Sequence, residues 1–346
     1  MTNKNPGRTH VTMRDVAKAA GVSRMTVSRA LKKNSPISKE TRDHILQVVK
    51  QMNYVPDQMA GSLTTKKSGF VAVLLPSLNN LHFALTVQSL TEELEKVGLQ
   101  LLLGHTDYSA EREEQLVETM LRRRPEAIVL SYDGHTQRTI DLLADVSVPI
   151  VEIWEKPKKP IAHTVGFSNS RAAFDMTKAL IDRGFKNIVF LGEGQDDWTR
   201  GAARREGFAK AMGSAGLNSD AQVMLGTPPL TIENGAAAVD IILERYPEVE
   251  CVFCVSDMAA FGVQSRLLQI GKSVPVDISV VGFGNFEVSR FSSPSISTVV
   301  VDPTEIGRQT GKLISQLLSE EGSPTDSPCH VTLTPRIEFR ESSKLA

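Results

Sequence analysis

Hydrophobic residues recur at helical spacing in the first fifty residues of the chain and form short, nearly continuous runs after residue 70. Two groups in the first region fall at positions i, i+3 and i+4, namely Val16, Ala19 and Ala20, and then Val27, Ala30 and Leu31. In the second region, runs such as 70–75 are typical of strands covered on both faces. The pattern therefore predicts a small helical head followed by a larger α/β body.

Capping residues delimit the helices of the head. Thr12 suits an N-cap with Asp15 as its capping-box partner, Gly21 can adopt the positive φ that ends a helix, and Ser23 can cap a second helix. A third helix is expected from Lys39 to about Asn53. Two short helices joined at a glycine form a helix-turn-helix, whose second helix can enter a DNA major groove. That helix would expose Arg24, Met25, Thr26, Ser28 and Arg29. The alternative, a helical hairpin within an enzyme, is disfavoured by this basic exposed face.

Strands and helices alternate along the body. The expected strands are 70–75, 99–103, 127–130, 148–151, 163–167, 187–191, 251–255 and 278–282, and the intervening helices include 111–123, 136–144, 200–215 and 232–245. Repeated βα units imply parallel sheets with right-handed crossovers. A polar, proline-containing break at 154–160 divides the series, so we expect two doubly wound lobes with a ligand cleft at the carboxyl ends of their strands.

Charge separates the two regions. Residues 1–68 hold 13 Lys and Arg against 4 Asp and Glu, and the remainder holds 26 against 36. A basic head on an acidic body is the electrostatic footprint of a DNA-binding module with a separate second function.

The polar and aromatic residues at the expected strand ends are the candidates for ligand binding. They are Ser77, Asn79, His82, Phe83, Ser168, Asn169, Trp198, Arg200, Arg204, Asp257, Phe283 and Asn285. Roles as cap or turn residues are the alternative, about as well founded for Asn169 and Asp257. Arg200 and Arg204 lie one helical turn apart at a helix start, where two guanidinium groups can hold a carboxylate or a phosphate. A solvated basic stripe that includes Arg205 remains the other interpretation.

Several function classes are disfavoured. The chain has neither an apolar leader nor a run of membrane-spanning length, so we expect a cytoplasmic protein with no membrane partner. Cys251 and Cys254 point to opposite faces of a strand, and the histidines show no ligand spacing, so we expect no metal. The run 191–194 is only a fragment of a dinucleotide fingerprint. We therefore expect no catalytic residues and no cofactor.

The residues described so far resemble the lactose/galactose repressor family. The resemblance rests on Ala20-Gly-Val-Ser23, Thr26-Val-Ser-Arg29 and Asn53-Tyr-Val-Pro56 in the head, and on Arg204, Gly207-Phe208 and Val280-Val-Gly-Phe283 in the body. It implies a homodimer that binds double-stranded operator DNA, with a hinge helix that folds on DNA and a periplasmic-binding-protein-like effector domain. The implied DNA-contacting residues are Thr12, Arg24, Met25, Thr26, Ser28, Arg29, Asn53, Tyr54, Ala60 and Leu63, with Leu63 inserted in the minor groove.

The resemblance also implies domain boundaries. The helix-turn-helix domain would span 1–56, the hinge helix and linker 57–69, and the effector-binding and dimerisation domain 70–346. Within the last, lobe 1 would comprise 70–162 and 294–322, and lobe 2 would comprise 163–293 and 323–346.

Within the family, the segments 74–80, 104–108 and 151–154 look like repressors of gluconate operons and their ketogluconate-responsive relatives. Many sugar-binding relatives carry aspartates where this chain has Gly284 and Ser168. The loss of carboxylates beside two arginines favours an anionic effector, so we expect a sugar acid that releases a repressor from a palindromic operator. A corepressor-dependent regulator and a two-lobed sugar-binding protein of the transport type are the alternatives.

Overall fold

The computed structural model describes residues 11–31, 36–55, 68–131, 134–194, 199–319 and 327–343. The chain forms two compact units, residues 1–68 and residues 69–346, referred to below as the head and the body. The expected hinge helix, with Ala60 and Leu63, lies outside the described residues, as does Trp198. Among the described residues, no helix is long and apolar enough to cross a membrane.

The described residues of the head form three helices, α1 (Met13–Ala19), α2 (Arg24–Ala30) and α3 (Lys39–Gln51). Thr12 and Asp15 form the expected capping box, since Thr12 Oγ1 accepts from Asp15 N at 3.4 Å and Asp15 Oδ2 accepts from Thr12 N at 2.9 Å. Gly21 has the expected positive φ of 65°. The side chain of Ser23 caps α2. The caps read from the sequence are thus confirmed, and α3 ends two residues earlier than expected.

The head has its own small core, to which all three helices contribute. Val16, Val27 and Ile45 are fully buried in it. One expectation was wrong: Ala19 is exposed and Ala17 is buried. The face of α1 that packs against α2 and α3 is the stripe Met13, Val16, Ala17 and Ala20, at i, i+3, i+4 and i+7, so the helix is rotated from the predicted orientation.

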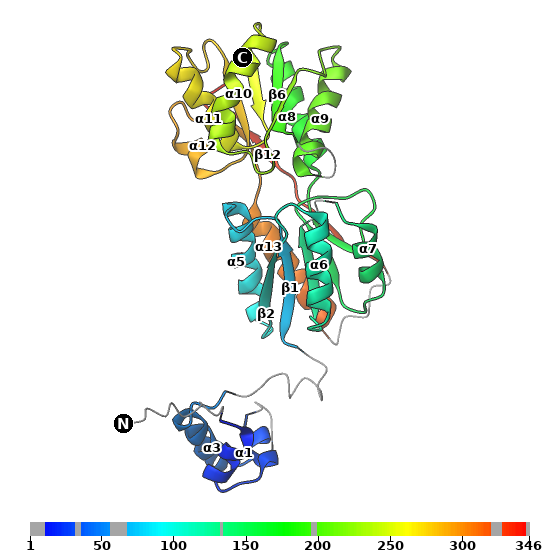
Figure 1. Ribbon diagram of the computed structural model, residues 1–346, viewed down its shortest axis with the longest axis vertical. Helices are drawn as coiled ribbons and strands as arrows, with labels where there is room; N and C mark the ends of the chain where they lie inside the picture. The colour runs from blue at the N-terminus through cyan, green and yellow to red at the C-terminus, as the bar shows by residue number, and fades with distance from the viewer. Residues whose placement is uncertain are drawn as a thin grey trace, which may run out of the picture. The chain divides into compact units, whose positions relative to one another are not determined.

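The body consists of two lobes, each built on a six-stranded sheet with helices packed against it (Figure 1). The strand order is β11-β5-β4-β3-β1-β2 in one sheet and β12-β10-β9-β8-β6-β7 in the other. Pairing is parallel except between β10 and β12. The first sheet contains β1 (Phe70–Leu75), β2 (Gln100–His105), β3 (Ala127–Ser131), β4 (Ile150–Ile153), β5 (His163–Gly166) and β11 (His330–Thr332). The second contains β6 (Ile188–Glu193), β7 (Gln222–Leu225), β8 (Cys251–Cys254), β9 (Ser279–Gly284), β10 (Ser297–Val300) and β12 (Arg336–Glu338).

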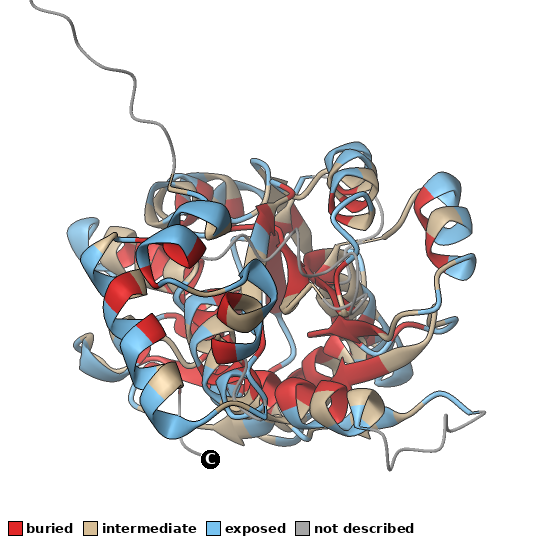
Figure 2. Cartoon of the chain, turned by 90° about the horizontal axis from the view of Figure 1, so that it is seen from below, coloured by how far each residue is buried: buried red, intermediate tan, exposed pale blue. Residues whose placement is uncertain are grey.

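The helices of the body follow the predicted alternation closely. They are α5 (Leu81–Glu95), α6 (Ala110–Leu121), α7 (Gln137–Ala144), α8 (Asn169–Asp182), α9 (Arg200–Ser214), α10 (Ile232–Arg245), α11 (Asp257–Gln269), α12 (Glu287–Phe291) and α13 (Pro303–Leu318). Buried residues concentrate on the strands and on the inward faces of these helices (Figure 2). The hydrophobic pattern thus located the βα units up to β9, although it did not reveal β7 or any of the elements after β9, including the 16-residue helix α13.

The sheets correct the expected lobe boundaries at three strands. β5 and β11 pair with each other in the first sheet, although residues 163–166 and 330–332 were assigned to the second lobe. β10 pairs with β9 in the second sheet, although residues 297–300 were assigned to the first lobe. α13 packs on α5, as the boundaries predicted, and Thr86 Oγ1 donates to the carbonyl of Pro303 at 3.0 Å. Strands of three or four residues carry too little periodicity to show which sheet they join.

Candidate functional site

A cavity of about 530 Å³ lies between the two lobes of the body. The carboxyl ends of β6 and β9 and the first turns of α5, α9 and α10 contribute to its lining. It therefore occupies the carboxyl edge where ligands bind in open α/β sheets. Seven of the residues predicted from the sequence line it: Ser77, Asn79, His82, Phe83, Arg200, Arg204 and Phe283.

Arg204 is held rigidly at this cavity. Its Nε donates to Asn169 Oδ1 at 2.8 Å, its Nη1 donates to the carbonyl of Val255 at 2.7 Å, and its guanidinium lies 3.7 Å from the centre of the Phe283 ring. Asn169 is itself fixed, because its Nδ2 donates to Glu155 Oε2 at 2.8 Å. Burial lowers the pKa of Arg204 to about 10, so the guanidinium remains charged at neutral pH.

Arg200 links the two lobes. It begins α9 in the second lobe, and its Nη1 donates to Ser131 Oγ, at the end of β3 in the first lobe, at 2.7 Å. Its guanidinium also lies 5.1 Å from the centre of the Phe83 ring on α5. The two predicted arginines therefore reach one cavity together, and one of them bridges the lobes.

Aromatic rings from both lobes stack across the cavity. The His82 ring, on α5, stacks on the Phe286 ring at 3.8 Å and lies 5.7 Å from the Trp154 ring. Burial, with a smaller effect from Arg204, lowers the pKa of His82 to about 3, so its imidazole is neutral at physiological pH. A Cβ at Gly284 would lie 2.8 Å from the Phe286 ring and 2.9 Å from the His82 ring. Gly284 therefore makes room for this stack.

Glu193, which was not among the predicted site residues, also lines the cavity. Burial raises the pKa of its carboxyl group, while Arg204 and Arg200 lower it. Glu193 is the last residue of β6, so the search at strand ends contained the signal for it. The segment 191–194 resembles a fragment of a nucleotide fingerprint, which hid the carboxylate at its strand end.

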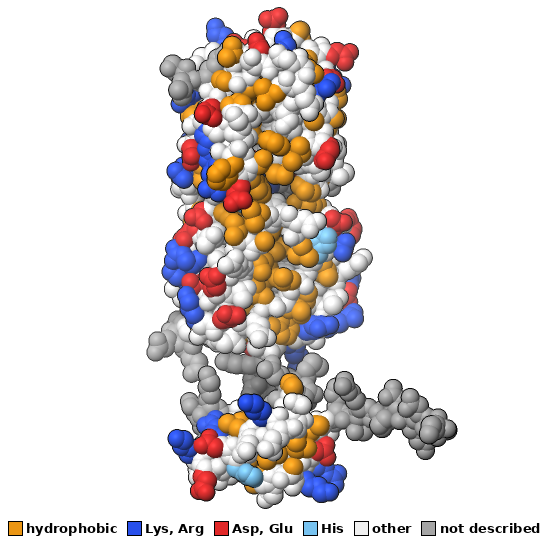
Figure 3. Space-filling model, turned by 90° about the vertical axis from the view of Figure 1, so that its left-hand side faces the viewer, with side chains coloured by type: hydrophobic (Ala, Val, Ile, Leu, Met, Phe, Trp, Pro, Cys, Tyr) orange, Lys and Arg blue, Asp and Glu red, His pale blue; other side chains and the backbone are white. Residues whose placement is uncertain are grey.

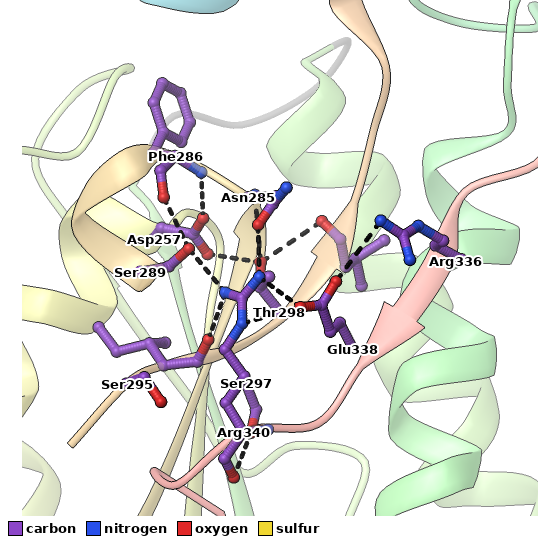
Figure 4. A network of polar contacts seen from close by, with 12 residues as sticks. Asp257, Asn285, Phe286, Ser289, Ser295, Ser297, Thr298, Arg336, Glu338 and Arg340 are labelled. Atoms are coloured by element: carbon purple, nitrogen blue, oxygen red, sulfur yellow. Dashed lines mark hydrogen bonds and ion pairs between the residues drawn. The ribbon is translucent and has the colours of Figure 1, made fainter. Parts of the chain in front are cut away.

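Four predicted effector-binding residues, Ser168, Asn169, Asp257 and Asn285, are not among the residues that line the cavity, so their contact with an effector stays a prediction. Ser168 caps α8, because its hydroxyl oxygen accepts a hydrogen bond from Arg171 N at 3.1 Å. Asn169 positions Arg204 by accepting a hydrogen bond from its Nε. The side chains of Asp257 and Asn285 accept hydrogen bonds from Phe286 N and from Arg340, within the polar network drawn in Figure 4. Of the four side chains, only that of Ser168 caps a helix, whereas those of Asn169, Asp257 and Asn285 bond to residues distant in the sequence.

This network holds the segment that carries Phe286. Asp257 Oδ2 accepts from Phe286 N at 2.7 Å, and its Oδ1 accepts from Thr298 Oγ1 at 2.6 Å. Arg340 Nη2 donates to Asn285 Oδ1 at 2.6 Å and to Glu338 Oε1 at 2.9 Å. Figure 4 shows these groups converging from α11, β10, β12 and the loop after β9. Burial raises the pKa of Asp257 to about 6.

The predicted DNA-reading residues lie on the surface of the head. Arg24, Met25 and Arg29 are exposed on α2, with Met25 67% exposed, and Thr26 and Ser28 are half-buried. Thr12 is exposed and forms the α1 cap, and Asn53 is exposed with a positive φ. Tyr54 is buried and belongs to the hydrophobic core of the head.

Comparison with known proteins gives consistent matches over both units. The profile of bacterial regulatory proteins of the lacI family matches residues 12–57, and that of periplasmic binding protein-like domains matches residues 177–343. The HTH-type transcriptional regulator GntR of Escherichia coli strain K12 is 29% identical over 324 residues, covering 93% of this chain and 97% of that protein. IdnR of the same strain is 30% identical over 308 residues, covering 88% and 91%. The crystal structure of a LacI family transcriptional regulator from Silicibacter pomeroyi is 67% identical, covers 80% of this chain and 99% of that chain, and has a TM-score of 0.77.

Proposed function

Because this chain belongs to the LacI family of bacterial transcriptional regulators, we propose that it represses sugar-acid catabolism and that a sugar acid releases it from its operator. The effector is an acid of the gluconate or ketogluconate kind. The observation that carries the proposal is the convergence of Arg200 and Arg204 on one interlobe cavity. Membership of the family implies two partners for this chain, operator DNA for the head and a small-molecule effector for the body.

The cavity suits a carboxylate. Arg204 is charged at neutral pH and is already oriented by two hydrogen bonds, so little side-chain entropy is lost when it binds a ligand. A hydrogen bond between a guanidinium and a carboxylate is roughly twice as strong as a neutral one. Ser77 and Asn79 supply polar groups for ligand hydroxyls, while Phe83 and Phe283 supply apolar walls.

Contacts across the cavity provide a route from effector to DNA. The Arg200–Ser131 hydrogen bond and the His82–Phe286 stack both join the lobes. An effector that binds both lobes stabilises their closed arrangement relative to an open one. The effector can change the free energy of DNA binding only by the difference between its affinities for the closed and the open arrangement of the lobes. For such coupling this difference is typically about 1–3 kcal/mol.

On DNA, α2 would enter the major groove of each half of a palindromic operator, with Arg24, Met25 and Arg29 reading base edges. Leu63, with Ala60 beside it, would be inserted in the minor groove and bend the duplex. Leu63→Ala should weaken specific binding and reduce bending in a gel-shift assay while leaving effector affinity intact. If DNA bending and operator affinity stay unchanged in this variant, the proposed insertion of Leu63 into the minor groove is wrong.

A palindromic operator requires a dimer, and the body offers a surface for one. Large hydrophobic side chains are exposed near α5 and β2 of the first lobe, among them Leu78, Leu81, Val97 and Leu103. Figure 3 shows hydrophobic side chains gathered along this face of the body. Exposed apolar patches of this kind mark association surfaces. Sedimentation at micromolar concentration should show a dimer, and a stable monomer there would refute this part of the proposal.

The effector assignment is tested by calorimetric titration of the full-length protein with sugar acids, their phosphates, and neutral sugars, combined with operator release in a gel-shift assay. Arg204→Ala should abolish the response to the acid and leave operator binding intact. Arg205→Ala, one position away and outside the cavity lining, is the matched control. Tighter binding of ribose or galactose than of any acid would overturn the proposal. Tightening of operator binding by the acid would show a corepressor instead.

A further inference from the structure

Three consecutive arginines lie at one edge of the first lobe. Arg122, Arg123 and Arg124 follow the end of α6, and all three are exposed. Arg122 forms an ion pair with Glu118 at 2.8 Å. Among the described residues, Arg123 and Arg124 form neither an ion pair nor a side-chain hydrogen bond. Two positive charges at this edge are therefore available to an anion from outside the body.

The same edge receives the chain that comes from the head. Glu126, two residues after Arg124, accepts a hydrogen bond through Oε1 from the N of Gly69 at 2.6 Å, and its own N donates to the carbonyl of Phe70 at 2.9 Å. Gly69 is the first residue of the body. Residues 56–67 connect the described parts of the two units, and a chain of this length spans at most about 45 Å. A head that is bound to DNA therefore holds this edge of the body within that distance.

Arg124 has a backbone conformation that favours glycine. Its φ is 53°, in the left-handed region, and its N donates to the carbonyl of Leu121 at 3.0 Å. After α5, α8, α9 and α11, the residues with positive φ are Gly98, Gly184, Gly216 and Gly271. A residue with a Cβ is strained in this conformation. Because the backbone favours glycine here, the arginine side chain calls for another explanation.

We propose that Arg123 and Arg124 bind phosphates of the operator backbone, so that the body contacts DNA as well as the head. The inference rests on operator binding in the proposed function and is independent of the effector. A guanidinium suits this ligand, because its N–H groups form paired, charge-assisted hydrogen bonds with phosphate oxygens. Phosphate contacts position a protein on the duplex but carry no sequence information directly. The body then adds affinity and salt dependence, while α2 determines the sequence preference.

The salt dependence of binding tests this contact. The probe is the duplex that the full-length protein selects from a random-sequence pool, and its affinity is measured by fluorescence anisotropy between about 50 and 200 mM salt. Each phosphate contact contributes about 0.9 to the slope of log K against log salt concentration. With one contact per protomer of a dimer, Arg123→Ala combined with Arg124→Gly should reduce that slope by about 1.8. Binding at 0.1 M salt should weaken by about tenfold or more.

Three controls separate a phosphate contact from a structural role. Arg245→Ala removes another exposed arginine, at the end of α10 in the second lobe, and should keep the wild-type slope. Replacement of Arg123 and Arg124 by lysine keeps both charges and should retain most of the slope, since lysine also binds phosphate. The variant with alanine at 123 and glycine at 124 should unfold in urea at the wild-type midpoint or above it, because glycine relieves the positive φ.

The possible failures are distinguishable. If the wild type selects no duplex, operator binding itself is wrong and this inference is lost with it. If the wild type binds but the double variant keeps its slope and affinity, only the contact from the body is wrong. A loss of affinity with an unchanged slope, or with a lower urea midpoint, would also overturn the inference, because the arginines would then act on the folded body. An equal loss of slope in the Arg245→Ala variant would show a general effect of charge and overturn it as well.

Discussion

Substitution of Gly284 by alanine should destabilise the body by about 1.5–4.5 kcal/mol. Gly284 has φ of +128°, a backbone conformation that costs a residue with a Cβ about 1–3 kcal/mol. The added Cβ would also lie 2.8 Å from the Phe286 ring and 2.9 Å from the His82 ring, so the rings must separate. Loss of an aromatic stack of this kind costs about 0.5–1.5 kcal/mol. The two terms act on the same segment and together give the stated range.

The assay is urea unfolding of the full-length protein, followed by near-ultraviolet circular dichroism and by tryptophan fluorescence, since Trp154 lies beside this stack. Gly213→Ala is the matched control, because its Cβ meets nothing within 4 Å and it lies in α9. The control should be neutral or more stable by about 0.5–1 kcal/mol. A Gly284→Ala protein as stable as the wild type would refute the argument that this glycine is required by the ring stack.

Three other measurements test separate parts of the molecule. Thr12→Ala removes the capping box of α1 and should lower head stability by about 1 kcal/mol in thermal unfolding, whereas an unchanged midpoint would show that the cap is dispensable. Arg29→Ala should cost about 1–3 kcal/mol on cognate DNA if the side chain reads a guanine edge, and equal loss on random DNA would indicate a phosphate contact. Burial lowers the pKa of His135, but Glu113 and Glu152 outweigh it and raise that pKa to about 9. This group therefore stabilises the body fully below its ordinary pKa of 6.5, and about 3 kcal/mol is lost as the pH rises through 9. His135→Gln should flatten this part of the pH dependence of unfolding, and a slope equal to that of the wild type would contradict the assignment.

Local signals in the sequence determined the helices of the head and the order of the βα units in the body. The Thr12–Asp15 box, the positive φ at Gly21 and the Ser23 cap depend on residues three or four positions apart, so the pattern contained all the participants. Arg200 and Arg204 were found for the same reason, since they share one helix start at a strand end.

Tertiary structure alone decided which polar residues reach the cavity. Asp257 and Asn285 also follow strands, but Thr298 and Arg340, distant in sequence, bind their side chains and keep them from the cavity lining. Glu193 lines the cavity, and its carboxylate fits against α9 only because Gly201 has no Cβ. Position at a strand end fixes the edge of the sheet where a side chain lies. Whether that side chain faces a ligand or a neighbouring element depends on long-range partners, which no local spacing encodes.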